Sequence, residues 1–144
     1  MTDTDNSYCT FHIDDLYFGI EVFKVQEVIK YQRMTQVPLA QDVVRGLMNL
    51  RGQIVTALDL RNRIGLPAPK EELEPMNVVV RTDDEAVSLL VDRIGDVVAT
   101  DDDQFEPPPE TMRGVPRDLI RGAFKLKDRL LLILDIDKVV APVT

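Results

Sequence analysis

Residues 45–60, RGLMNLRGQIVTALDL, recur in altered form as residues 121–136, RGAFKLKDRLLLILDI, seventy-six positions further along the chain. The two copies align without a gap. Each begins with Arg-Gly, breaks at a polar pair (Arg51-Gly52 or Lys127-Asp128) and continues as a mainly apolar run that ends at an aspartate. Glycine and aspartate at such a break are typical of a turn between two strands. The stretch therefore predicts a β-hairpin that occurs twice.

The aspartates that end the two copies suit the N-cap of a short helix, because their carboxylates can accept from free backbone amides of its first turn. After Asp59 we expect this helix over residues 60–64. Gly65 would end it, and Pro67 lies just beyond.

A second repeated segment precedes the first in each half. Residues 9–13 and 16–20 alternate apolar and polar side chains around Asp14-Asp15, which predicts another hairpin. The pattern starts again at Met76, with Asp83-Asp84 at its turn, sixty-nine positions later. Two segments thus repeat in the same order, which indicates an internal duplication.

Many short strands, tight turns and short helices predict an all-β fold, and the duplication predicts two small barrels or sheets related by a pseudo-two-fold axis. We expect a single domain over residues 8–140, made of repeat regions 8–66 and 76–140, with residues 1–7 as a disordered lead-in. Each region is too small to bury a core of its own, so the two should share one.

Two connecting segments also carry patterns. Val22, Val25 and Ile29 follow one another at spacings of three and four, which predicts one helical turn. In the second half, the segment from Asp101 to Pro109 is acidic and rich in proline, so we expect a loop there rather than a central strand.

The composition argues against several classes of protein. The chain has 144 residues, with 17 Lys and Arg against 25 Asp and Glu, a formal charge of −8. This charge argues against nucleic-acid binding, which needs clustered positive charge. The single cysteine cannot form an intrachain disulfide. The sequence shows neither a signal-peptide pattern nor an apolar run of the ~20 residues needed to span a membrane, so we expect a soluble, cytoplasmic protein.

The residues also argue against most catalytic sites. A Ser-His-Asp triad would need His12, which would face solvent if Phe11 and Ile13 point into the core. One histidine and one cysteine, Cys9, cannot build a zinc site without several carboxylates. Asp101 to Asp103 lack the ligand spacing of an EF-hand loop. We therefore expect a binding module without metal or cofactor; a hydrolase that uses paired carboxylates stays open as an alternative.

Four segments resemble the CheW-type coupling proteins of bacterial chemotaxis, and the resemblance extends over residues 8–140. These segments are FGIEVFKVQEVI (18–29), VPLAQDVVRGLMNLRGQIVTALDLRNRIGL (37–66), SLLVDRIGDV (88–97) and LIRGAFKLKDRLLLILDIDKV (119–139). The resemblance implies a mainly-β fold of two intertwined five-stranded SH3-like barrels. It also implies a non-catalytic adaptor that links the cytoplasmic tip of transmembrane chemoreceptors to the regulatory domain of a CheA-type histidine kinase. Such an adaptor is cytoplasmic, is recruited to receptor arrays without entering the membrane, and is monomeric when isolated.

The resemblance also implies roles for five residues. Val25 would be an apolar contact for the receptor tip, and Glu27 and Arg51 would be a charged pair that shapes the receptor and kinase surfaces. Gly46 and Gly52 match glycines whose replacement should distort these surfaces. No residue is assigned to the kinase contact.

Other interpretations stay open at this level. Val25 also suits a core position, and an exposed arginine at a turn is often simply solvated. Asp96 and Lys127 occupy the positions equivalent to Glu27 and Arg51, so an acid-base pair could be a structural feature of each repeat. Alternative functions are a scaffold of another chemosensory pathway, such as twitching motility or surface sensing, a kinase-independent array scaffold and, more distantly, a nucleic-acid-binding barrel.

Overall fold

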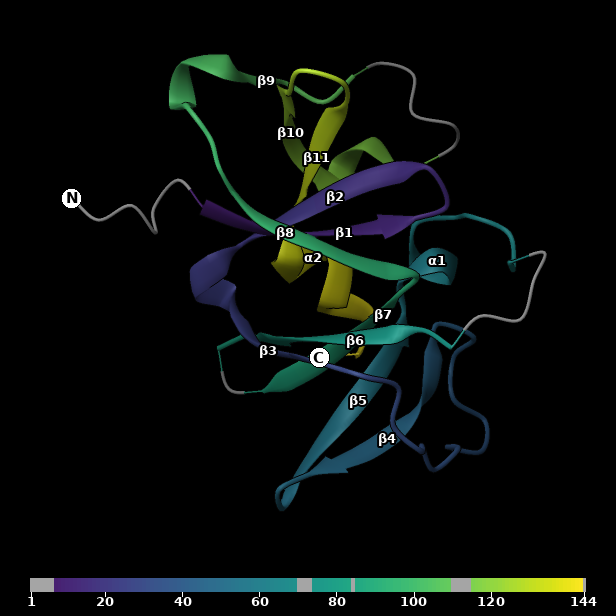
Figure 1. The fold of residues 1–144 in the computed structure, drawn as a ribbon. Helices are drawn as coiled ribbons and strands as arrows, with labels where there is room; N and C mark the ends of the chain where they lie inside the picture. The colour runs from purple at the N-terminus through teal and green to yellow at the C-terminus, as the bar shows by residue number, and fades with distance from the viewer. Residues whose placement is uncertain (1–6, 70–73, 84, 110–114, 144) are drawn as a thin grey trace.

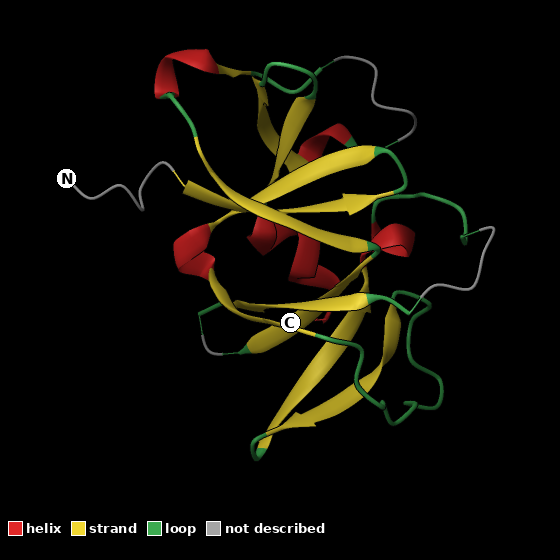
Figure 2. Cartoon of the chain, in the orientation of Figure 1, coloured by secondary structure: helices red, strands yellow, loops and turns green. Residues whose placement is uncertain are grey.

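Strands dominate the computed structural model of the chain, which describes residues 7–69, 74–83, 85–109 and 115–143 (Figure 2). The strands are β1 (Ser7–Ile13), β2 (Leu16–Glu21), β3 (Val25–Ile29), β4 (Val44–Leu50), β5 (Gln53–Asp59), β6 (Met76–Arg81), β7 (Ala86–Val91), β8 (Arg93–Ala99), β9 (Phe105–Glu106), β10 (Ile120–Lys125) and β11 (Leu130–Leu134). The short helices are α1 (Leu60–Arg63), α2 (Ile136–Val140) and the 3-10 turns η2 (Val22–Lys24), η3 (Asp102–Gln104), η4 (Arg117–Leu119) and η5 (Ala141–Val143). The predicted all-β class is confirmed. The predicted lead-in at residues 1–7 lies outside the described residues except for Ser7, which begins β1.

The strands form two sheets, which lie one above the other in Figure 1. Sheet I has the order β8-β1-β2-β11-β10-β9, and sheet II has the order β3-β6-β7-β5-β4. Sheet II has the expected five strands, whereas sheet I gains a sixth because the two-residue β9 pairs with β10. The segment of the first half that corresponds to β9 forms only one isolated β-bridge with sheet II, between Thr35 and Leu47.

The two halves of the chain exchange strands between the sheets. The first half gives β1 and β2 to sheet I and β3 to β5 to sheet II, and the second half does the reverse with β6, β7 and the later strands. The antiparallel pair β1-β8 therefore corresponds to β6-β3, and the parallel pair β2-β11 corresponds to β7-β5. Because each sheet is complete only with strands from both halves, the predicted intertwined fold is confirmed.

A shared core holds the sheets together. Phe11 and Phe18 of sheet I and Leu58 of sheet II are fully buried in one apolar cluster. This cluster also contains Leu60 at the start of α1 and Ile136 at the start of α2, which lies between the sheets (Figure 1). Each copy of the repeated stretch is thus followed by a short helix that packs into the same core.

One connecting segment differs from the expectation. Only residues 22–24 form a helical turn, η2, and the chain then extends as β3. Val25 lies opposite Val80, and Glu27 lies opposite Val79, in an antiparallel pair with β6. The predicted helical turn over Val22 to Ile29 is therefore wrong beyond residue 24, because backbone pairing with a distant strand overrides the local spacing.

The N-caps provide a first test of the repeat. Asp59 Oδ1 accepts from the Asn62 backbone amide at 3.2 Å, and Asp135 caps α2 in the same way. Replacing Asp59 with alanine should lower the free energy of unfolding by about 1 kcal/mol, measured by urea denaturation. Asp59→Asn is the matched control, since asparagine also caps helices. Equal stability of wild type and the alanine variant would show that the cap contributes nothing.

Candidate functional site

Glu27 and Arg51 form an ion pair between the two edges of sheet II. Glu27 lies on β3, at one edge, and Arg51 lies in the turn of the β4-β5 hairpin, at the other edge. Arg51 Nη2 donates to Glu27 Oε2. The Arg51 side chain is 74% exposed and that of Glu27 only 18%. The pair thus connects the open edges of the sheet and still presents the arginine to solvent.

The turn that carries Arg51 has a defined backbone. Arg51 and Gly52 have φ angles of 51° and 87°, which are typical of a two-residue type I′ hairpin turn. Asn49 Oδ1 accepts from the Gly52 backbone amide at 2.9 Å. A side chain at position 52 would meet no atom within 4 Å, so the demand for glycine there is conformational.

Gly46 is required for a different reason. A Cβ atom at this position would lie 2.8 Å from the Thr35 carbonyl oxygen and 2.9 Å from Met34 Cβ. The glycine therefore allows the segment around Thr35 to pack against β4, where Thr35 and Leu47 exchange two backbone hydrogen bonds. The sequence marked both glycines, but the close approach at Gly46 becomes visible only in the fold.

Two further side chains extend the Glu27 site across β3. The Gln26 amide nitrogen lies 3.5 Å from Glu27 Oε2, and Arg81 Nε donates to Gln26 Oε1 at 3.2 Å. An exposed ion pair of this kind contributes only about 0–1 kcal/mol to stability. The arrangement therefore fixes the pattern of charge on this surface more than it stabilises the fold.

The second half does not repeat the pair. Asp96 and Lys127, at the equivalent positions, form no ion pair with each other in the part of the chain that the structure describes. The Asp96 carbonyl oxygen instead accepts from the Thr10 hydroxyl at 2.5 Å. The Glu27-Arg51 pair is thus a feature of one half and not of the repeated unit.

Val25 is half-buried and packs against the shared core, so it is only partly available as a contact. Its neighbours expose more apolar surface: Phe23 of η2 is 65% exposed and Val28 of β3 is 39% exposed. Val97, on the equivalent edge strand β8, is 63% exposed. The sequence pattern did not mark these three residues, although Phe23 and Val28 lie on either side of Val25 and Glu27.

His12 is partly exposed on the side of β1 opposite to Phe11 and Ile13, which are fully buried as expected. Its ring stacks on Tyr17 at 4.8 Å, and Arg129 Nη1 lies 3.2 Å from Nε2. Burial, and then the positive charges of Arg93 and Arg129, lower the pKa of His12 below its ordinary value of 6.5. These surroundings favour a neutral imidazole with a structural role.

The lowered pKa has a defined effect on stability. Below pH 6.5 the unfolded chain takes up a proton on His12 more readily than the folded chain, so stability should be full above this pH and fall below it. We expect His12→Gln to lose this part of the pH dependence. Urea denaturation of both proteins, above and below pH 6.5, measures the difference. The same pH dependence in the two proteins would show that His12 does not contribute to it.

Within the described residues, no helix combines the length and apolar character needed to cross a membrane. The exposed charge of Arg51 and the exposed apolar side chains of Phe23 and Val28 suit contact with other proteins.

Comparison with known proteins identifies the family. A family model described as CheW-like domain matches residues 7–143. The chain is 30% identical to a chemotaxis protein CheW of Bacillus subtilis over 94% of its length and 87% of that protein. It is 27% identical to a chemotaxis protein CheW of Treponema pallidum, over 96% and 84% of the two chains.

A solved structure shows the same fold. The crystal structure of the scaffolding protein TtCheW from Thermoanaerobacter tengcongensis matches with a TM-score of 0.84 and 25% identity, over 93% of this chain and 86% of that chain. Family and fold both point to a scaffold and not to an enzyme. The duplicated chain, with its strands exchanged between two sheets, belongs to the CheW family of chemotaxis scaffold proteins.

Proposed function

We propose that this protein couples transmembrane chemoreceptors to the regulatory domain of a CheA-type histidine kinase, in the cytoplasm, at membrane-associated receptor arrays. The observation that carries this proposal is the exposed Glu27-Arg51 ion pair, which the equivalent positions of the second half do not form. A charge pattern that the duplicated fold does not need suits recognition of a partner.

The receptor tip would contact the surface around β3. Partner helices typically combine an apolar face with charged flanks. Phe23 and Val28 supply exposed apolar surface on either side of the half-buried Val25, and Glu27 and Arg51 supply charge beside it. Gly52 sets the turn that presents Arg51, and Gly46 keeps the hairpin packed against the Thr35 segment. In this proposal Val25, Glu27 and Arg51 contact the partner, and Gly46 and Gly52 shape the hairpin that carries Arg51.

The kinase would bind elsewhere on the same body. Because the two sheets share one core, the molecule can hold two partners in a fixed relative geometry. A change at the receptor would then shift the kinase between active and inactive states, as differential binding requires. A scaffold of another chemosensory pathway, or one that occupies arrays without a kinase, is the alternative.

A charge reversal tests the receptor face. Arg51→Glu should weaken binding of a purified receptor-tip fragment at least about tenfold, equivalent to 1.4 kcal/mol. Stability should change by less than about 1 kcal/mol, because Arg51 is mostly exposed. Calorimetric titration and urea denaturation measure the two effects. The matched control is Arg45→Glu on β4, whose side chain is 47% exposed.

The reversed pair Glu27→Arg with Arg51→Glu separates two ways in which the pair can act. It restores the ion pair but inverts the charge that the partner meets, so we expect recovered stability without recovered binding. Full recovery of binding would show that the pair acts only through the internal shape of the barrel. Equal weakening by Arg45→Glu would contradict the assignment of Arg51.

A further inference from the structure

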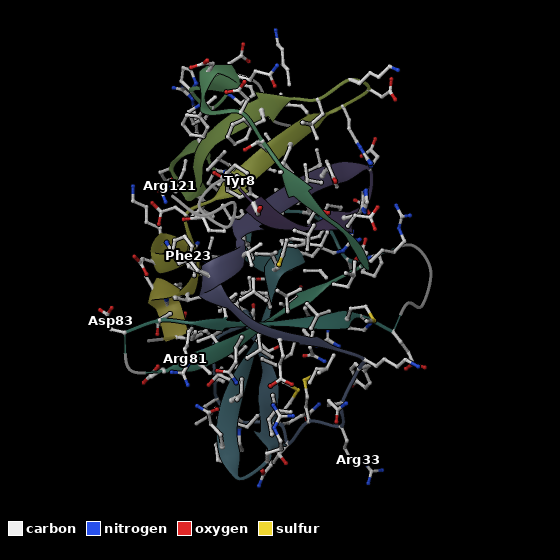
Figure 3. All side chains as sticks on the ribbon, turned by 60° about the vertical axis from the view of Figure 1, so that its left-hand side comes forward. Tyr8, Phe23, Arg33, Arg81, Asp83 and Arg121 are labelled. Carbon is white, nitrogen blue, oxygen red and sulfur yellow. The ribbon has the colours of Figure 1, made fainter. Side chains whose placement is uncertain are left out.

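A pocket of about 280 Å³ opens at the side of sheet I. It is lined by three aromatic rings, one aliphatic side chain and two charged groups: Tyr8, Phe23, Phe105, Ile133, Glu21 and Arg121. Figure 3 shows Tyr8, Phe23 and Arg121 together on one side of the molecule. The lining shares Phe23 with the proposed receptor face but includes neither Glu27 nor Arg51.

Glu21 gives this pocket an unsatisfied acceptor. The residue is 7% exposed, and its Oε2 atom accepts from Arg121 Nη1 at 2.9 Å. Lys24 Nζ lies 3.4 Å from the same oxygen. The other oxygen, Oε1, is buried and has no hydrogen-bond partner among the residues that the structure describes. Since buried polar atoms are nearly always paired, Oε1 is a suitable acceptor for a further donor.

The aromatic walls suit a positively charged donor. Phe23 is 65% exposed and Phe105 is 44% exposed, and the faces of such rings attract cations. Phe105 and Tyr8 each pack against Phe124, with ring centroids 5.1 and 5.5 Å apart, so two walls are held in place before a ligand arrives.

The surrounding charge favours the same ligand. Both local cations use Oε2 of Glu21, which leaves Oε1 free for a third donor. The chain as a whole carries a formal charge of −8, and Asp101 and Asp103 are exposed on the segment that leads into Phe105. The acidic surface draws a cation towards this region, while Lys24 and Arg121 offset the charge of Glu21 inside the pocket.

The duplicated fold does not require these groups. In the second half, the positions equivalent to Glu21 and Phe23 are Leu90, which is apolar, and Asp92, which pairs with Arg61. Leu90 is buried, as an ordinary strand residue is. The acid and the ring are therefore additions to the shared framework of the two repeats.

We propose that this pocket binds a basic side chain, arginine or lysine, that a partner protein inserts between Phe23 and Phe105. The charged end donates to Glu21 Oε1, and the carbon chain packs on the two rings. A volume of about 280 Å³ is at or below the lower limit of pockets that enclose whole small molecules, and suits a single side chain. This site shares Phe23 with the proposed receptor face, and its other lining residues lie outside that face.

Nuclear magnetic resonance titration with a blocked tripeptide, acetyl-Gly-Arg-Gly-amide, tests the proposal. We expect saturable shifts at Glu21, Phe23 and Phe105 with a Kd of about 1 mM. The same peptide with citrulline in place of arginine is isosteric but neutral, and should bind at least about tenfold more weakly. Equal binding of the two peptides, or no shift with either, would overturn the proposal.

Two variants locate the site. Glu21→Gln should abolish the shifts, and Phe23→Ala should weaken binding about fivefold, close to 1 kcal/mol at 0.59 kcal/mol per unit of RT. Phe23 is exposed, so that variant folds even if Glu21→Gln does not. Ile54→Ala is the matched control, because Ile54 is 60% exposed on β5 in the other sheet. Unchanged binding by Phe23→Ala, or tighter binding of free arginine than of the peptide, would contradict a protein side chain as the ligand.

Discussion

Replacing Arg61 with methionine should lower the free energy of unfolding by about 3 kcal/mol, the largest effect that we expect from one substitution. Arg61 is 6% exposed in α1. Its Nη2 atom donates to Asp14 Oδ1 at 2.8 Å and to Asp92 Oδ2 at 2.5 Å, and Nη1 donates to the Pro67 carbonyl oxygen at 3.0 Å. Methionine fills similar space but donates no hydrogen bond. Asp14 Oδ1 and the Pro67 carbonyl oxygen lose the Arg61 donor, and Asp92 Oδ2 keeps only the Asp14 backbone amide. Breaking buried pairs of this kind costs about 3–5 kcal/mol, and the half-exposed Asp14 places the effect at the lower end.

The location of Arg61 explains why its loss should affect the whole fold. Asp14 lies in the β1-β2 turn of sheet I, and Asp92 lies where the chain passes from sheet II to sheet I. Burial lowers the pKa of Arg61, but its hydrogen bonds and the charges of Asp14 and Asp92 outweigh burial and raise it. The guanidinium therefore stays charged and joins the two sheets throughout the usual pH range.

Guanidinium chloride denaturation of Arg61→Met and of a matched control measures this effect. The control is Arg45→Met, because Arg45 also pairs with an aspartate but its side chain is 47% exposed. Its Nη1 atom lies 3.6 Å from Asp59 Oδ2. We expect a loss of less than about 1 kcal/mol in the control. A similarly small loss for Arg61→Met would show that the buried network does not stabilise the junction of the sheets.

Gly46→Ala should destabilise the protein by about 1–3 kcal/mol through overpacking. The new methyl group would stand 2.8 Å from the Thr35 carbonyl oxygen, so either β4 or the neighbouring segment has to move. Gly52→Ala meets no atom but must adopt a φ of 87°, for which about 1–2 kcal/mol is the usual cost. The two substitutions therefore destabilise neighbouring positions of one hairpin by different mechanisms.

Amide hydrogen exchange distinguishes these mechanisms. The Thr35 and Leu47 amides donate to each other's carbonyl oxygens at 2.9 and 2.8 Å. Both should exchange faster in Gly46→Ala, beyond the effect of the global loss of stability, because the methyl group separates the two segments. They should keep their relative protection in Gly52→Ala. The same exchange pattern in both variants would contradict a steric role for Gly46.

Local patterns predicted the parts of the fold that depend on neighbours in sequence. Alternation around Asp14-Asp15 gave the β1-β2 hairpin, and the aspartates at the ends of the repeated stretch gave two helix caps. The exchange of strands between the halves followed only from the family resemblance, because short-range spacing carries no information on which distant strand is paired. For the same reason, β3 was mistaken in part for a helical turn.

The candidate site shows the same limit. Glu27 and Arg51 are twenty-four positions apart and lie at opposite edges of a sheet, so their contact could be anticipated only from relatives. Arg61 and Glu21 were missed altogether. In sequence they look like ordinary surface charges, and their burial depends on partners from segments up to 100 positions away.

Divergence of the two halves provides a common explanation for these sites. Among the described residues, Asp96 and Lys127 do not repeat the exposed ion pair, and Leu90 and Asp92 replace the acid and the ring of the pocket. A duplicated unit gives two similar barrels, whereas binding two different partners requires different surfaces. Residues that differ between equivalent positions of the two halves are therefore the first candidates for substitution.

Calorimetric titration of the purified protein with the regulatory domain of each CheA-type kinase of the source organism tests the proposed coupling most directly. Each titration is run with the protein alone and with the protein saturated by a receptor-tip fragment. We expect one kinase domain to bind with a Kd of about 1 μM or tighter, and to bind the receptor-loaded protein as well. No heat with any kinase domain, or displacement of the receptor fragment by the kinase domain, would contradict an adaptor that holds both partners at once.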